Sequence, residues 1–215
     1  MPSDHSAPRL PTSLAAKRQG KVGVLWLACS EKRNAPADRT LLGIETYFAE
    51  LGHDIEAVVL ASEGCNFAQG LDDTDLLKRG TNETIEHSHI WRRALTSIQF
   101  GKVPVVAVLH GAVIGGGLAL AAAAHIRVAE RSAYYALPEG SFGICLGSRA
   151  VTQLRMLIGI GRMMDMVLTG RTYSAEEGQV IGLSTYLVDE GKGLCQALDL
   201  AKHIAEDNND SLGGG

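Results

Sequence analysis

Gly115, Gly116 and Gly117 form a junction between two runs of opposite structural preference. Before them, residues 103–109 (VPVVAVL) have the β-branched composition of a buried strand, and after them residues 118–124 (LALAAAA) are strong helix formers. Glycine costs about 1 kcal/mol in a helix interior, so it is kept where the backbone takes a positive φ or another group approaches closely. The junction therefore predicts a buried strand, a tight turn and a helix whose first turn lies very close to another group.

Strand-like and helix-like patterns alternate along the rest of the chain. The expected strands are 21–27, 56–60, 103–109, 126–129 and 185–188. The expected helices are 38–51, a short stretch opened by Asp72 and Asp73, 84–99, a segment from the Ser174/Glu177 capping box to Gly182, and 197–205. Strands separated by helical segments favour an α/β fold with helical crossovers. The alternation alone does not distinguish a flat doubly wound sheet from other mostly parallel arrangements.

Length and composition suit one globular domain. The chain has 215 residues, of which 46% are hydrophobic and 20% charged. This composition allows a sizeable core and excludes wholesale disorder. We expect a polar N-terminal tail at 1–20, a single domain at 21–206 and a flexible C-terminal tail at 207–215.

Charge, hydropathy and cysteine spacing limit the partners and the compartment. A net charge of -4 and a pI near 6.0 provide no basic footprint for nucleic acid. No apolar run reaches the roughly 18 residues that a membrane span needs, and the N-terminus lacks the apolar centre of a secretory signal. Four cysteines without CxxC spacing are typical of a reducing compartment. We therefore expect a cytoplasmic protein that binds neither nucleic acid nor membrane.

The glycine junction matches neither of the common phosphate-binding loops. A dinucleotide fingerprint needs a third glycine where Leu120 stands, and a P-loop needs Lys and Ser/Thr at Leu118 and Ala119. The unpaired N–H groups at a helix N-terminus can instead hold a developing negative charge, as in an oxyanion hole. The alternative is a tight crossing of helix and strand that admits only glycine. Three glycines in a row at this junction favour the anion-binding interpretation.

Motifs on both sides of the junction resemble those of the enoyl-CoA hydratase/isomerase, or crotonase, superfamily. Residues 102–139 match the family's P-x-[IV]-A-x-[IV]-x-G-x-x-x-G-G-G run, its following strand and its P-E motif. Residues 66–72 (NFAQGLD) are similar to the family's F-x-x-G-x-D loop, and 32–35 (KRNA) resembles its coenzyme A-binding turn. A further family segment resembles residues 161–182. The resemblance covers about residues 21–205 with the motif spacing preserved.

The resemblance implies a fold and an assembly. The fold would be α/β, a crotonase-like spiral of β-β-α units with mostly parallel sheets and surrounding helices. The assembly would be a homotrimer or a dimer of trimers, since closed symmetry is usual for soluble homo-oligomers. Apolar residues gathered in one helical region would supply the contact surface: Met156, Leu157, Ile158, Met163, Met164 and Met166.

The resemblance also implies a substrate and the residues that bind it. The substrate would be an acyl-CoA or enoyl-CoA thioester, with no separate cofactor and no metal. The N–H groups of Leu71 and Gly116 would form the oxyanion hole, and Glu139 of the P-E motif would be the catalytic acid/base. The other substrate-binding positions would be Lys32, Arg33, Asn34, Ala35, Ala68, Gly70, Gly115 and Ala119.

One position departs from the pattern of the hydratases. Those enzymes use two glutamates, and Ala119 stands where the first belongs, three residues after Gly116. A single carboxylate can move a proton between the α and γ carbons of an enoyl chain, whereas adding water is easier with two. The departure favours isomerase-type or related single-glutamate chemistry. The alternatives are a hydratase that uses Glu139 alone and a CoA-thioester-binding protein without turnover.

The histidines and tryptophans have plainer interpretations. His87 and His89 could form a metal pair, but at i and i+2 on a helix their side chains should point apart. His125 stands where many family members have aspartate, and we expect a packed or surface histidine there. Trp26 and Trp91 are expected to be core or interface aromatics.

Overall fold

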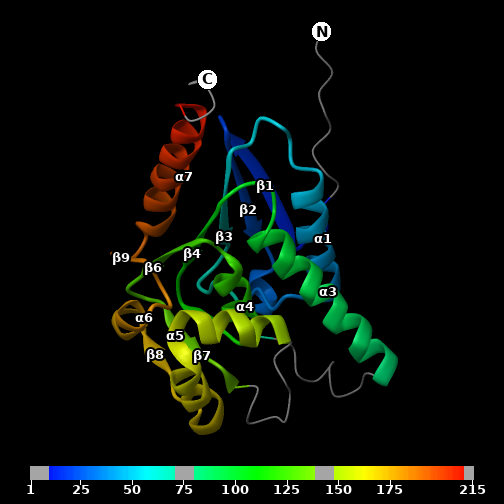
Figure 1. Cartoon of the computed structure of the whole chain (residues 1–215), viewed down its shortest axis with the longest axis vertical. Coiled ribbons are helices and arrows are strands. Elements are labelled where there is room, and N and C mark those ends of the chain that lie inside the picture. The colour runs from blue at the N-terminus through cyan, green and yellow to red at the C-terminus, as the bar shows by residue number, and fades with distance from the viewer. Residues whose placement is uncertain (1–9, 71–79, 139–147, 211–215) are drawn as a thin grey trace.

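Six strands form the main sheet of the computed structural model, which describes residues 10–70, 80–138 and 148–210 (Figure 1). Their order is β1 (Leu14–Gln19), β2 (Val22–Leu27), β3 (Ala57–Ser62), β4 (Val105–Leu109), β6 (Ile126–Glu130) and β9 (Tyr186–Val188). Strand β1 is antiparallel to β2, and all other neighbours are parallel. The strands follow chain order because each crossover moves one position in the same direction.

A second sheet, of three strands, shows how the chain advances. Its order is β5 (Ala112–Ile114), β7 (Tyr134–Ala136) and β8 (Tyr173–Ser174). Strand β5 follows β4 and precedes α4 (Gly116–Ala123), while β7 follows β6 and precedes α5 (Ser148–Thr169). Each β-β-α unit therefore places one strand in each sheet. This arrangement confirms the expected spiral and excludes a flat doubly wound sheet.

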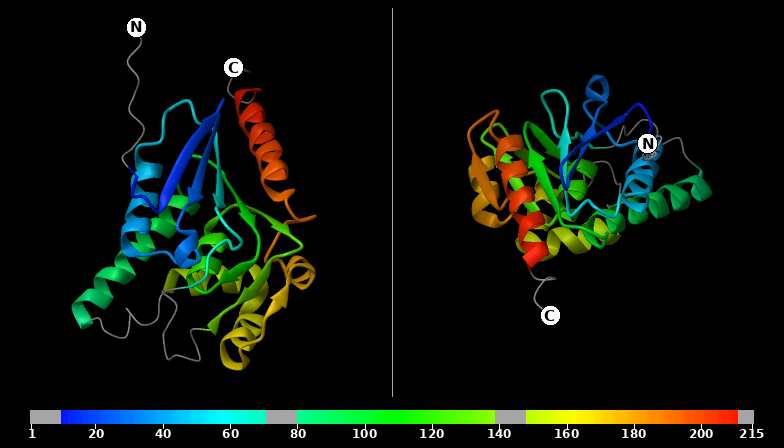
Figure 2. Two further views of the ribbon diagram at one scale, coloured as in Figure 1. Left: turned by 180° about the vertical axis from the view of Figure 1, so that it is seen from behind. Right: turned by 90° about the horizontal axis from the view of Figure 1, so that it is seen from above.

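The main sheet has a different helical cover on each face (Figure 2). On one face lie α1 (Asp38–Ala49), α3 (Thr81–Gln99) and α4, over a core of leucine, isoleucine and aromatic side chains. On the other face lies α7 (Gly193–Asp210), over a smaller core of valine and alanine. The remaining helical elements are η1 (Ser30–Lys32) and α6 (Ala175–Ile181).

Capping residues decide where two helices begin. Before α6, the Ser174 hydroxyl accepts from the Glu177 N–H (3.2 Å) and the Glu177 carboxylate accepts from the Ser174 N–H (2.9 Å), which confirms the predicted capping box. Helix α3 begins at Thr81 rather than 84, because Gly80 is its N-cap and donates to the Glu83 carboxylate (3.1 Å). The added turn of α3 is exposed and polar, so it has no apolar periodicity to reveal it.

The structure differs from the expected boundaries at both ends. Strand β1 lies inside the predicted tail 1–20, because Leu14–Gln19 pairs with β2 although only Leu14 is buried. Helix α7 continues to Asp210, into the predicted tail 207–215. Strands β5, β7 and β8 were not expected, since runs of two or three residues are too short to show a period of two.

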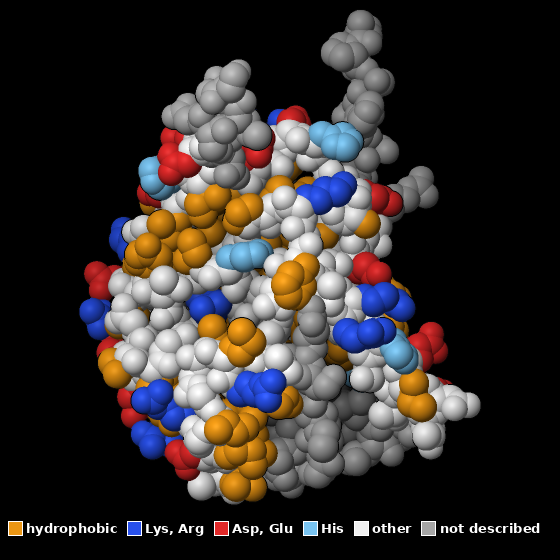
Figure 3. Space-filling view, viewed as in Figure 1, with side chains coloured by type: hydrophobic (Ala, Val, Ile, Leu, Met, Phe, Trp, Pro, Cys, Tyr) orange, Lys and Arg blue, Asp and Glu red, His pale blue; other side chains and the backbone are white. Residues whose placement is uncertain are grey.

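Helix α5 exposes only part of the apolar surface expected of it. Ile158, Met163 and Met166 are buried in the chain's own core. The exposed apolar side chains of α5 are Met156, Ile160, Met164 and Leu168. Hydrophobic side chains gather in the lower part of Figure 3, where Figure 1 places α5 and α6. The trimeric assembly stays a prediction. Neither α5 nor any other helix in the described part of the chain is long and apolar enough to cross a bilayer.

Candidate active site

Backbone conformation and close packing account for the three glycines at the start of α4. Gly115 has a φ of 52°, in the left-handed region that favours glycine. A Cβ on Gly116 would lie 2.7 Å from Cη2 of Trp91, and one on Gly117 would overlap the Ala68 carbonyl. The tight-packing alternative therefore explains why glycine stands here. Anion binding has to rest on the backbone N–H groups, not on the missing side chains.

The N–H of Gly116 is one of the donors that this packing leaves available in the first turn of α4. Gly116 is buried, and its N–H has no acceptor among the described residues, and the same holds for the N–H groups of Gly117 and Leu118. The bonded donors before and after them are Gly115, which donates to the Ala136 carbonyl, and Ala119, which donates to the Gly115 carbonyl, both at 3.0 Å. Buried N–H groups are nearly always bonded, and a helix N-terminus carries partial positive charge. The geometry thus fits an anionic or carbonyl oxygen at Gly116.

The loop after β3 runs beside β5 and ends next to this donor. The Ala68 N–H donates to the Ala112 carbonyl (3.1 Å), and the Ile114 N–H donates to the Ala68 carbonyl (3.0 Å). Both backbone groups of Ala68 are therefore bonded within the protein. Gly70 lies against the start of α4, where a Cβ would be 3.6 Å from the Gly116 nitrogen. Two of the predicted site positions, Gly70 and Gly116, are thus brought together.

Asn34 ties the KRNA turn to the same loop. The side chain is 3% exposed, and its Oδ1 accepts from the Cys29 N–H (2.9 Å). Its Nδ2 donates to the carbonyls of Glu63 (2.7 Å) and Asn66 (2.9 Å). These bonds give Asn34 a structural role that the sequence motif alone did not indicate, in addition to its predicted place at the coenzyme A-binding turn.

The charged residues of that turn face outward. Lys32 and Arg33 have exposed side chains, and Ala35 is half-buried. The Arg33 carbonyl accepts from the Gln69 N–H (3.0 Å), next to Gly70. The backbone of this turn is therefore anchored beside the loop that leads to Gly116, and its two exposed cationic side chains suit the phosphate groups of a ligand.

The described residues hold only part of the predicted catalytic group. Ala119 is 1% exposed, in the first turns of α4. Glu139 and Leu71 lie outside the described residues, and their roles stay predictions. Ala136, three residues before Glu139 in the sequence, is bonded to Gly115.

Trp91 is a site neighbour that the sequence analysis assigned only to a core or interface. The core assignment is confirmed, because the side chain is 9% exposed. Its six-membered ring lies directly against Gly116. An aromatic residue on a helix carries no signal for such a contact, because the two residues come from different helices.

The two histidines of α3 point apart, as expected. His87 is 6% exposed and bonded to Trp91 and Asp38, whereas His89 is exposed and lies 3.2 Å from a guanidinium nitrogen of Arg92. Within the described ranges, no group of three or more His, Cys, Asp or Glu side chains could hold a metal ion.

His125 is an exposed histidine immediately before β6. Its Nδ1 accepts from the Val105 N–H (3.1 Å), which confirms the plain interpretation of this residue. Partial burial of the imidazole lowers its pKa.

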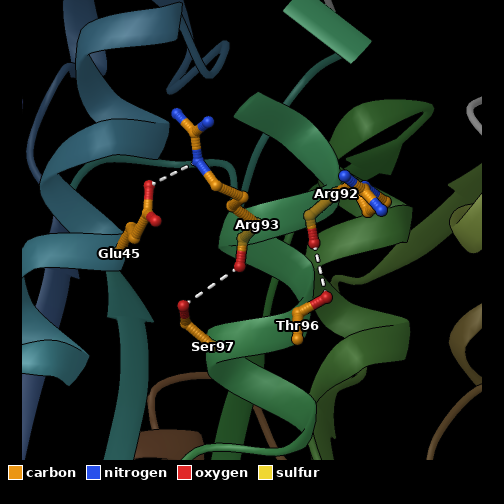
Figure 4. A pocket seen from close by; sticks show the side chains of 5 residues that line it. All are labelled: Glu45, Arg92, Arg93, Thr96 and Ser97. Carbon is orange, nitrogen blue, oxygen red and sulfur yellow. Dashed lines mark hydrogen bonds and ion pairs between the residues drawn. The ribbon is translucent and has the colours of Figure 1, made fainter. Parts of the chain in front are cut away.

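A separate groove runs between α1 and α3 (Figure 4). It has a volume of about 440 Å³ and is lined by Glu45, Arg92, Arg93, Thr96 and Ser97. The Arg93 Nε donates to the Glu45 carboxylate (3.0 Å), so that pair of charges is already neutralised. None of the predicted site residues lines this groove.

Comparison with known proteins identifies the family that shares this arrangement. Residues 17–213 match the family model described as enoyl-CoA hydratase/isomerase. The chain belongs to this family. It is 31% identical over 178 residues to the peroxisomal fatty acid β-oxidation multifunctional protein AIM1 of Arabidopsis thaliana, covering 80% of the chain and 24% of that protein. It is 27% identical to the short-chain-enoyl-CoA hydratase of Clostridium acetobutylicum, covering 87% of the chain and 73% of that protein.

Solved structures of similar proteins have the same fold. A candidate enoyl-CoA hydratase from Rhodopseudomonas palustris CGA009 is 46% identical, with a TM-score of 0.87 over 90% of this chain and 75% of that one. DspI of Pseudomonas aeruginosa is 28% identical, with a TM-score of 0.88 over 94% of this chain and 84% of that one. The crotonase-type α/β fold is thereby confirmed.

Proposed function

We propose that this protein is a single-glutamate enzyme that shifts the double bond of an enoyl-CoA thioester through an enolate. Its family includes proteins named short-chain-enoyl-CoA hydratase, methylglutaconyl-CoA hydratase 1 and enoyl-CoA isomerase/hydratase. All of these names refer to CoA thioesters. A thioester substrate for this chain is the natural extension of that shared chemistry.

The observation that carries the proposal is the buried N–H of Gly116, which has no acceptor among the described residues. In the proposed complex, the thioester carbonyl oxygen accepts from this N–H and from that of Leu71, the residue after Gly70. Removal of a proton from the α carbon moves negative charge onto that oxygen. Donors already aimed at the oxygen then stabilise the enolate more than the ground state, which lowers the barrier.

Glu139 would move the proton. Its carboxylate would take a proton from the α carbon of a 3-enoyl thioester and return it to the γ carbon, giving the 2-enoyl isomer. One carboxylate completes this cycle and is unchanged at its end. The phosphates of coenzyme A would lie near the exposed cations Lys32 and Arg33.

Ala119 separates this proposal from the first of its two alternatives, the hydratase. The hydratase names of several relatives favour addition of water, but an alanine cannot orient or deprotonate water. Hydration would therefore have to rely on Glu139 alone. A thioester-binding protein without turnover is the second alternative, and only activity measurements separate it from the enzymes.

The test is a screen of the purified protein against matched 2-enoyl-CoA, 3-enoyl-CoA and β-hydroxyacyl-CoA thioesters of several chain lengths. We expect interconversion of the 3-enoyl and 2-enoyl forms to exceed hydration. Faster hydration would establish the hydratase instead. Binding of the thioesters without any turnover would establish the non-catalytic alternative.

We further propose that the protein assembles as a homotrimer or a dimer of trimers, with the exposed apolar side chains of α5 at the contacts. Met156 and Leu168, 77% and 75% exposed, would be buried there. Sedimentation at micromolar concentrations should give a trimeric or hexameric mass, and a monomeric mass would contradict this assembly.

A further inference from the structure

Two hydrogen bonds and a ring contact connect α1 to the first turn of α4 through α3. The Trp91 indole Nε1–H donates to Nε2 of His87 (3.1 Å), and Nδ1 of His87 is bonded to the Asp38 carboxylate. Helices α1 and α3 lie side by side, so these contacts join neighbouring elements (Figure 1). At the other end of this connection, the Trp91 ring contacts Gly116.

The contacts define the protonation state of His87. Indole nitrogen can only donate, so Nε2 of His87 must be the acceptor and carries no proton. The ring hydrogen is therefore on Nδ1, where it is donated to Asp38. Asp38 thus selects the tautomer of His87, and that tautomer holds the indole N–H in one direction.

A purely space-filling role would not require this arrangement. The surrounding positions of the core are filled by apolar side chains, including Ile90, Leu95 and Ile98 of the same helix. Apolar contacts alone allow a ring to turn about its side-chain bonds, whereas a fully bonded polar chain fixes its orientation. Here the hydrogen bond holds the five-membered ring, and the six-membered ring of the same rigid indole limits the position of Gly116.

We propose that Asp38, His87 and Trp91 are positioning residues that hold the first turn of α4, and with it the Gly116 N–H, where it can bind the thioester oxygen. The inference rests on the proposed function. A displacement of about 1 Å at a catalytic donor is enough to reduce a rate about 100-fold. The Trp91 ring prevents this displacement by its contact with Gly116, and the hydrogen bonds of His87 and Asp38 hold the ring in position.

The first test compares His87→Leu with His89→Leu, two residues away on the exposed side of the same helix. For the folded protein, His87→Leu should lower kcat on the 3-enoyl-CoA thioester about 10- to 100-fold with KM within about threefold, because the oxyanion contact matters most in the transition state. His89→Leu should match the wild type. His87→Gln, which keeps one donor and one acceptor, should recover most of kcat.

Two results would overturn the positioning role. One is a folded His87→Leu protein with wild-type kcat, which would leave His87 only a part in stability. The other is a His87→Gln protein no better than His87→Leu. If His87→Leu does not fold, Trp91→Phe replaces it, since the variant keeps a ring and removes the N–H. A kcat loss of about tenfold is then expected, and an unchanged kcat overturns the proposal.

A second test does not depend on turnover. Trp26→Phe leaves Trp91 as the single tryptophan, since the chain has two. In that background, His87→Leu should shift the Trp91 emission maximum, and His89→Leu should not. Binding of acetoacetyl-CoA then reports on the Gly116 N–H. The enolate of this thioester absorbs in the near ultraviolet, so its binding can be followed optically, and it should bind less tightly to His87→Leu. An unshifted emission overturns the hydrogen-bond chain. A shifted emission in a protein that neither binds nor converts any thioester overturns the proposed function instead.

Discussion

The two faces of the main sheet are covered by different kinds of side chain. On the α7 face, the buried residues of the sheet and helix are valine and alanine, and the Glu130 carboxylate accepts from the Gly193 N–H (2.9 Å) at the start of α7. On the opposite face, larger apolar side chains surround the glycines of α4, and a polar chain crosses the core from Asp38 to Trp91. The first face stabilises the sheet, while the second also positions the candidate chemistry. Stability and activity should therefore respond differently to substitutions on the two faces.

The largest expected effect is at the P-E motif. Glu139→Gln should reduce turnover at least about 1000-fold, because it removes the proposed carrier of the proton and the rate then depends on the oxyanion contact alone. Affinity for the acyl-CoA should stay within about tenfold, since the proposed thioester contacts are made by backbone N–H groups. Steady-state kinetics and calorimetric titration measure the two quantities.

The matched control for Glu139 is Glu130, a buried glutamate earlier in the sequence, on strand β6. Glu130→Gln keeps an oxygen that can accept from Gly193, so kcat should not change. Full activity in Glu139→Gln would contradict its assignment as the acid/base.

A methyl group at the junction should have the next largest effect. Gly116→Ala places a Cβ 2.7 Å from the Trp91 ring, so either the ring or the start of α4 must move. We expect kcat to fall about 100-fold, the scale of a misplaced oxyanion donor. Gly161→Ala is the control, because its Cβ meets nothing within 4 Å. That variant should keep kcat, and because exposed Gly161 lies just after the kink in α5 at Gly159 (φ 79°) and not in a helix interior, its unfolding free energy should change by less than about 0.5 kcal/mol.

Truncation of the core separates the two faces directly. Val59 is fully buried on the α7 face, and Val59→Ala should lower the unfolding free energy of the protein by about 2 kcal/mol with kcat unchanged. Leu109 is fully buried on the opposite face at the end of β4, and Leu109→Ala should lower the unfolding free energy by about 3 kcal/mol. Because β4 leads into β5 and α4, Leu109→Ala should also lower kcat. Urea unfolding and kinetics at a temperature where both variants are folded give the comparison, and equal kcat values would contradict it.

The sequence predicted the parts of the molecule that repeat a pattern. Helices α1, α3 and α7 and the buried strands β2, β3, β4 and β6 have clear apolar patterns, and the family motifs supplied the spiral order. No bounds were predicted for α5, whose two helical segments meet at Gly159, and β9 is only partly buried. The short strands of the second sheet have too few residues for a period, and β1 is an edge strand with one buried side chain.

The strand-to-helix junction was predicted in the right place, but the reason for its glycines was not. Glycine at 115–117 marked the correct junction, and Gly70 and Gly116 do lie together. The groups that require glycine are Trp91 and Ala68, which are distant in the sequence. A residue pattern records which side chain is missing, but the neighbour that excludes it depends on tertiary packing. The hydrogen bonds of His87 were not predicted for the same reason, because its partners Asp38 and Trp91 lie on two different helices.

The smallest expected effect concerns His125, which stands between the C-terminal end of α4 and the start of β6, whereas Gly116 is at the other end of that helix. Its pKa is lowered mainly by burial, so the unfolded state binds a proton more readily than the folded state. The contribution of neutral His125 to stability is therefore complete above its ordinary pKa of 6.5 and is lost as the pH falls through the lower folded value. His125→Asn keeps an acceptor for the Val105 N–H but cannot titrate. Urea unfolding between pH 7.5 and 5 should show a shallower loss of stability in this variant, with kcat unchanged at neutral pH. An identical pH dependence in the two proteins would mean that the imidazole remains solvated, and the acid sensitivity would then have to come from carboxylates.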